Sequence, residues 1–207
     1  MLKKFFKDIF NRGNFKDYFK RNKVFLSFAT ILLVLSLLSG FYSYSSYTEI
    51  ATSMMGEVAS VASSDYTVTD NMMVLFANNF FSNIYVMGMG LLFSIPSIII
   101  TVLNGVLVGY VFSTRDFFRT FVSVAPHGIF ELIALVFSLA GAFLVTKMEI
   151  RLLSGILSRK DMGDIILRLK VPFKDLILSV SIVLVLLVVG AIIEAMLTPV
   201  LMSSFGI

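Results

Sequence analysis

The 207-residue chain contains no cysteine and no tryptophan, and it has a single histidine. Without cysteine the chain forms neither disulfide bonds nor thiolate metal sites, so its redox compartment stays open. Without tryptophan, Tyr and Phe must supply the aromatic anchors at a membrane interface. Charged residues make up only 14% of the chain, against 57% hydrophobic residues, and the apolar runs approach bilayer length. The composition therefore predicts an all-α, polytopic membrane protein.

Basic residues are absent from one long region. No Lys or Arg lies between Val24 and Thr114, whereas residues 1–23 hold eight and residues 147–174 hold seven. The positive-inside rule places both basic segments in the cytoplasm, which predicts a cytoplasmic N-terminus and an outside C-terminus at the cell membrane. About five spans then fit the chain, at 24–44, 75–95, 97–113, 121–146 and 173–197.

The region 72–146 leaves two topologies open. Three crossings put Pro96 near the turn of a tight hairpin. The alternative is one crossing plus a re-entrant segment containing His127 and Glu131, which would keep Arg115 on the cytoplasmic side, as the charge rule prefers locally. We favour three crossings.

Two segments are predicted to be amphipathic and interfacial. Residues 1–23 are expected to form a basic cytoplasmic segment before one transmembrane domain at 24–207. They begin with an apolar stripe opposite Lys3, Lys4 and Lys7, and the stripe consists of Leu2, Phe5, Phe6, Ile9 and Phe10. Residues 148–171 place apolar side chains between basic ones, which is also typical of a helix or helix pair at the cytoplasmic membrane surface. Membrane lipids are the expected partners and explain the basic tract without nucleic acid. The loop 47–71 shows helical spacing from Ile50 onward and is either a short helix on the outer surface or a polar connector.

The stretch Pro126-His127-Gly128-Ile129-Phe130-Glu131 is the main candidate for a site. Helical spacing places His127 and Glu131 on one face, one turn apart, and Pro126 is predicted to lie in the first turn of that helix. Ionisable groups in a membrane span indicate function. An ion or ligand site, catalysis, and hydrogen bonding between helices remain open. His127 and Glu131 could bind a metal, but a structural zinc site needs four ligands.

Other polar and small residues extend this candidate site. A polar intramembrane site is predicted from His127 and Glu131 together with Asn104, Glu194, Asn78, Asn79 and Asn83, although the three neighbouring asparagines could instead cap a helix. Close helix packing, within the chain or across a homodimer, is predicted at Gly88, Gly90, Gly105 and Gly109. No nucleotide-binding or catalytic signature is present, and no cofactor is expected.

The segment Pro126-His127-Gly128-Ile129-x-Glu131-Leu132 resembles the signature of the stage II sporulation protein M family of membrane proteins. Further matches follow over residues 78–199: Asn78-Asn79, Asn104-Gly105 with Gly109, and Glu194 with Pro199. The family pattern commonly has Pro where this chain has Ile133. The resemblance implies a shared buried site of His127, Glu131, Asn104 and Glu194. It also implies membrane-protein partners, because the named member acts with a peptidoglycan-degrading protein and another membrane protein during engulfment of the forespore. Many relatives occur in organisms that form no spores, so the role in engulfment is not assigned to this chain.

Three functions are compatible with these patterns. The leading hypothesis is a non-enzymatic scaffold or assembly component of a membrane complex, present as a homodimer. The second is a channel or transporter for an ion or small solute, with a path lined by His127, Glu131, Asn104 and Glu194. The third is a membrane-embedded, metal-dependent hydrolase.

Overall fold

The protein is helical throughout the residues that the computed structural model describes, which are 7–61 and 68–206. The helices are α2 (Arg12–Tyr42), α3 (Tyr44–Val61), α4 (Val68–Gly88), the 3-10 helix η1 (Met89–Leu92), α5 (Ile95–Thr114), α6 (Phe117–Leu157) and α7 (Met162–Ser204). The all-α prediction is confirmed, and α3 shows that the loop at 47–71 contains a helix. Most of the apolar stripe predicted before Phe10 lies outside the described residues.

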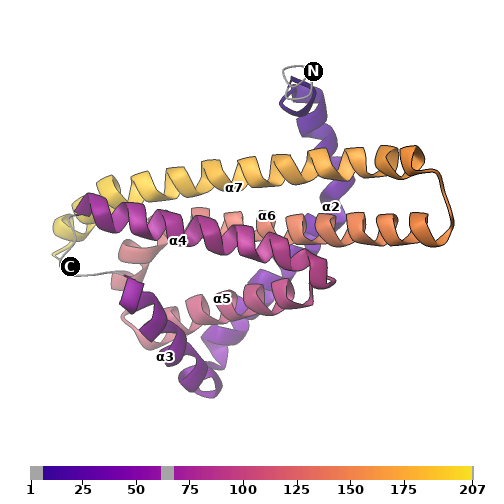
Figure 1. Ribbon diagram of the computed structural model, residues 1–207. Coiled ribbons are helices and arrows are strands. Elements are labelled where there is room, and N and C mark those ends of the chain that lie inside the picture. Colours follow the sequence, from indigo (N-terminus) through magenta and orange to yellow (C-terminus); the bar gives the residue numbers. More distant parts are fainter. Residues whose placement is uncertain (1–6, 62–67, 207) are drawn as a thin grey trace.

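Four of the described helices, α2, α5, α6 and α7, are long and apolar enough to cross a membrane. Helix α4, continued by η1, packs against α6 and α7. The helices α4, α5, α6 and α7 alternate in direction along the bundle (Figure 1). This arrangement agrees with about five spans, and residues 72–146 form three antiparallel segments rather than a re-entrant loop. Below, the hairpin end is the end of the bundle where α6 connects to α7.

A tight turn joins η1 to α5. Phe93 and Ser94 adopt the left-handed region, at φ 54° and 59°, which is uncommon for residues other than glycine. Hydroxyl groups hold the turn against α6. Ser94 Oγ lies 2.7 Å from Thr146 Oγ1, and Thr146 Oγ1 donates a hydrogen bond to the Gly90 carbonyl at 2.6 Å. Pro96 lies in the first turn of α5, where its missing N–H costs nothing, as the hairpin prediction requires.

Helix α6 begins earlier than the sequence pattern predicted. The Asp116 side chain caps the helix by accepting a hydrogen bond from the Arg119 amide at 2.8 Å. Capping of this kind satisfies a backbone donor that a helix start would otherwise leave free. The helix therefore starts at Phe117, and Pro126 lies inside it. The prediction that Pro126 occupies the first turn is wrong.

The segment 148–171 forms a helix pair, made of the end of α6 and the start of α7, rather than a separate helix. These helices have 41 and 43 residues, so each is about 60 Å long at ~1.5 Å per residue, roughly twice the hydrocarbon thickness. Their connected ends extend past the other helices (Figure 1). Pro172 lies within α7. Its missing N–H leaves the Arg168 carbonyl without its usual helical donor, and Arg151 Nη1 donates to that carbonyl at 2.8 Å.

Near the hairpin end, α2 is held to α7 by a buried charge. Asp175, whose side chain is 2% exposed, accepts hydrogen bonds from Arg21 at 2.5 and 3.0 Å and from Asn22 at 3.0 Å. One turn along each helix, Tyr18 Oη lies 2.8 Å from Ser179 Oγ. We call the group of Arg21, Asn22 and Asp175 the Asp175 clamp. Sequence reasoning missed it, although Asp175 is the only acid between Asp164 and Glu194.

Farther along, α2 runs beside α5 in the same direction and in backbone contact. A Cβ atom at Gly109 would lie 2.0 Å from the Leu37 carbonyl oxygen, and one at Gly40 would lie 2.2 Å from the Val106 carbonyl oxygen. Gly105 faces Ser36 in the same way. Small residues allow membrane helices to approach this closely. Gly105 and Gly109 are thus covered within the chain.

The two glycines before the α4–α5 turn differ from each other. A Cβ atom at Gly90 would lie 2.3 Å from the Ala142 carbonyl oxygen, so Gly90 lets η1 pack closely on α6. At Gly88 nothing lies within 4 Å of such an atom, because this position faces open space. Gly88 therefore makes no close helix contact within the described part of the chain.

The Asp175 clamp makes a prediction about stability. We expect Asp175→Ala to lower the free energy of unfolding by about 3–5 kcal/mol, because it leaves buried donors and the Arg21 charge without their partner. Asp17 is the matched control, since it also contacts Arg21, at 4.0 Å, but is 58% exposed; its replacement by Ala should cost about 0.5 kcal/mol or less. Unfolding by SDS titration in detergent, followed by circular dichroism, measures both. Equal effects of the two substitutions would contradict the clamp.

Candidate functional site

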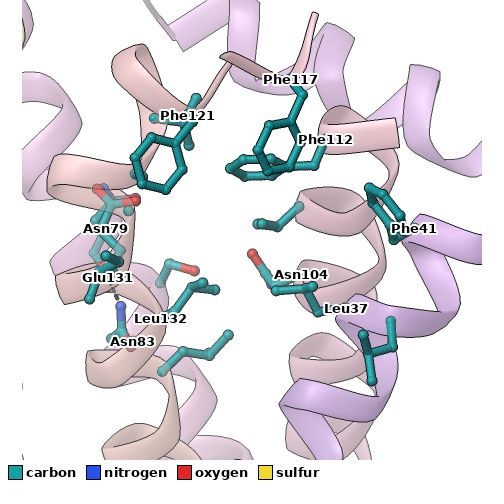
Figure 2. Close-up of a pocket in the computed structure, with 18 of the residues that line it drawn as sticks. Leu37, Phe41, Asn79, Asn83, Asn104, Phe112, Phe117, Phe121, Glu131 and Leu132 are labelled. Carbon is teal, nitrogen blue, oxygen red and sulfur yellow. Dashed lines mark hydrogen bonds between the residues drawn. The ribbon is translucent and has the colours of Figure 1, made fainter. Parts of the chain in front are cut away.

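A cavity of about 530 Å³ lies between α2 and α5 on one side and α4 and α6 on the other. Its walls are mostly apolar, and Figure 2 shows polar side chains on facing sides of it. A volume of this size suits a small organic molecule. The polar lining residues are Asn79, Ser82, Asn83, Asn104 and Glu131.

The wall formed by α4 and α6 carries a chain of hydrogen bonds. Asn79 Nδ2 donates to Glu131 Oε1 at 2.5 Å, and Asn83 Nδ2 donates to the Asn79 carbonyl at 2.8 Å. Ser138 Oγ then donates to Asn83 Oδ1 at 2.7 Å, deeper in the bundle. These bonds position the Glu131 carboxylate at the cavity surface. The same bonds tie α4 to α6, so the wall combines a site with a helix contact.

Asn104 stands on the facing wall, on α5. Its Nδ2 donates to the Ile100 carbonyl one turn earlier at 2.8 Å, which holds the amide in place. Figure 2 shows its amide oxygen directed into the cavity, across from Asn79 and Glu131. The cavity therefore offers an acceptor on one side and a carboxylate with an amide on the other.

Aromatic rings gather at one end of the cavity, near the connection between α5 and α6 (Figure 2). Phe112 and Phe117 contact each other edge to face, with ring centroids 5.7 Å apart. Phe117 and Phe121 stack at 6.4 Å, and Phe41 of α2 completes the aromatic side. Sequence reasoning missed these rings as site residues. In the sequence these rings form a cluster of Phe on both sides of the Arg115–Asp116 connection, and such a cluster is equally typical of anchoring at the membrane interface.

His127 lies on the side of α6 that faces α7, Glu194 lies on α7, and neither lines the cavity. A Cβ atom at Gly190 of α7 would lie 3.6 Å from the His127 carbonyl oxygen, so the two backbones are close there. Glu194 interacts electrostatically with both His127 and Glu131. His127 Nδ1 is buried and makes no hydrogen bond to the described residues.

The structure thus divides the predicted polar site. Four of its members line the cavity, and His127 and Glu194 form a neighbouring pair behind Glu131. Asn78 is exposed on α4 and belongs to neither group. In the part of the chain that the structure describes, no three His, Asp or Glu side chains are grouped so that they could hold a metal ion.

Fold and cavity together define a polytopic helical membrane protein with a mostly apolar chamber that carries a few polar side chains. The family model for stage II sporulation protein M matches residues 29–199, which include α2 from Ala29 onward, both walls of the cavity and the His127–Glu194 pair. The chain belongs to this family, as the Pro-His-Gly segment indicated. No curated protein and no solved structure matches the chain significantly.

Proposed function

We propose that the protein binds a small amphiphilic solute within the membrane and carries it across. The observation that supports this proposal is the cavity of about 530 Å³ with Asn104 on one wall and Asn79 with Glu131 on the other. Polar groups inside a membrane are costly unless they satisfy each other or serve a ligand. Here the Asn104 oxygen faces the cavity rather than a helix, which favours a ligand (Figure 2).

The direction of access follows from charge. Basic residues concentrate before Val24 and over 147–174, so the hairpin end faces the cytoplasm and the C-terminus lies outside. The aromatic end of the cavity lies away from the hairpin end and then faces the outer surface, and we propose it as the mouth of the cavity. An amphiphilic solute enters between the Phe rings and places its polar group between Asn104 and Glu131.

For the solute to leave on the cytoplasmic side, the two walls of the cavity must separate at their cytoplasmic ends. Helices α2 and α5 form one wall and stay together through the Gly105 and Gly109 contacts. Helices α4 and α6 form the other and stay together through the Asn79–Glu131 and Asn83–Ser138 hydrogen bonds. We expect each pair of helices to move as a unit. The Asp175 clamp, where α2 is held to α7, stays in place during this movement.

Because the chain has no cysteine, one introduced thiol reports on the cavity without background. We expect Asn104→Cys, in sealed vesicles, to react quickly with a water-soluble methanethiosulfonate added outside, since the cavity opens to that side. Ala140→Cys is the control on α6, because Ala140 is 0% exposed, and it should stay unmodified. Mass spectrometry measures the modified fraction. Equal, slow reaction at both positions would show that solutes do not reach the cavity and would refute the proposal.

The connected ends of α6 and α7 favour scaffolding as a second candidate function. They extend past the other helices and expose apolar side chains, including Leu157 at 83% and Leu167 at 65% (Figure 1). Such a surface suits contact with a second copy or another membrane protein. Leu157→Cys in native membranes, treated with a bifunctional thiol reagent, should then yield a discrete larger species that Tyr85→Cys, an exposed control on α4, does not give. Recovery of the monomer alone would count against scaffolding.

A further inference from the structure

The charge inside the cavity bears on what the solute is. Glu131 is the only acidic residue among the residues described as lining it, and no Lys, Arg or His lines it with them. The walls from α4, α5 and the second half of α2 have no basic residue to supply, since none occurs between Val24 and Thr114. Glu131 accepts a hydrogen bond from the neutral Asn79 amide. Among the residues described as lining it, the cavity therefore has one acidic side chain and no cationic partner for that side chain.

The aromatic mouth is a second feature that favours a cation. The faces of Phe rings carry negative electrostatic potential and attract cations within about 6 Å of the ring centre. Phe41, Phe112, Phe117 and Phe121 gather over the cavity on the side from which the solute enters (Figure 2). The aliphatic lining between them and Glu131 provides apolar surface for the body of a ligand, as at Leu37 and Leu132.

We propose that the solute is a lipophilic organic cation, such as an amine or quaternary centre with apolar substituents. Its positive charge compensates Glu131, its substituents contact the aliphatic walls, and the Phe rings select for cations at the mouth. Asn104 contributes its amide oxygen as a neutral acceptor opposite the carboxylate, which also favours a positively charged group (Figure 2). This inference rests on the proposed function and specifies its substrate class.

Two ions of nearly identical shape and opposite charge test the inference. We expect tetraphenylphosphonium to bind the purified protein in detergent, measured by equilibrium dialysis with radiolabelled ion, and to slow modification of Asn104→Cys. Tetraphenylborate should not compete at equal concentration, because it carries the charge that Glu131 repels. Equal competition by tetraphenylborate would mean that the cavity recognises only apolar bulk and would overturn the inference.

Substitutions separate the charge from the packing. Glu131→Gln keeps an acceptor for Asn79 but removes the charge, and it should weaken tetraphenylphosphonium binding about 30-fold. Phe121→Leu keeps an apolar side chain without a ring face and should weaken binding about threefold to tenfold. Glu149→Gln makes the same charge change elsewhere on α6, outside the cavity lining, and should bind like the unaltered protein. Circular dichroism and size-exclusion profiles matching the unaltered protein verify that each variant is folded.

Thiol reactivity of Asn104→Cys tests the proposed function, and binding of tetraphenylphosphonium tests the cation class separately. If Asn104→Cys reacts quickly but tetraphenylphosphonium neither binds nor protects it, the cation class is wrong and the solute-binding cavity stands. If Asn104→Cys is unreactive, the proposed function fails as well. Unchanged binding by Glu131→Gln also overturns the inference, because the carboxylate is then not what attracts the cation.

Discussion

The position of α2 depends on two contacts of different chemistry, and the cavity depends on the position of α2. At the hairpin end, buried Asp175 holds Arg21 and Asn22, which fixes α2 to α7. Toward the opposite end, Gly40, Gly105 and Gly109 bring α2 and α5 into backbone contact. A buried carboxylate requires its partners, and glycine contacts allow only one close alignment. Since α2 leaves α7 to follow α5, a gap remains between this pair and α4 with α6, and the cavity occupies that gap.

The cavity combines features that packing alone does not require. Asn79, Asn83 and Ser138 make the helix-to-helix hydrogen bonds expected of polar residues in a membrane bundle. Asn104 differs, because its amide is anchored on its own helix and presents oxygen to open space (Figure 2). With Glu131 opposite and no basic residue described in the lining, the polar groups that the chamber offers are acidic or neutral. The same polar residues thus join the helices and define a site.

Much of the fold follows from the sequence, because a bilayer restricts both the length and the polarity of a span. Apolar runs and Pro96 predicted the all-α fold and the α4–α5 hairpin. Helix ends were less predictable: Asp116 starts α6 well before Pro126, and Arg151 supports the carbonyl that Pro172 leaves free. Asn79, Asn104 and Glu131 were recognisable as intramembrane polar residues. Their separation from His127 and Glu194 depends on which face of α6 meets α7, and the clamp joins residues far apart in sequence, so neither was evident beforehand.

The central claim is that Asn104 and Glu131 face each other across open space. Oxidative crosslinking of Asn104→Cys/Glu131→Cys tests it most directly, in a chain without other thiols. Ser94→Cys/Thr146→Cys is the positive control, because these hydroxyl oxygens are 2.7 Å apart. We expect copper phenanthroline to form a disulfide in the control pair but not in the cavity pair. A longer bis-thiol reagent should bridge the cavity pair. Ready disulfide formation between positions 104 and 131 would show that the walls touch, and it would contradict the cavity.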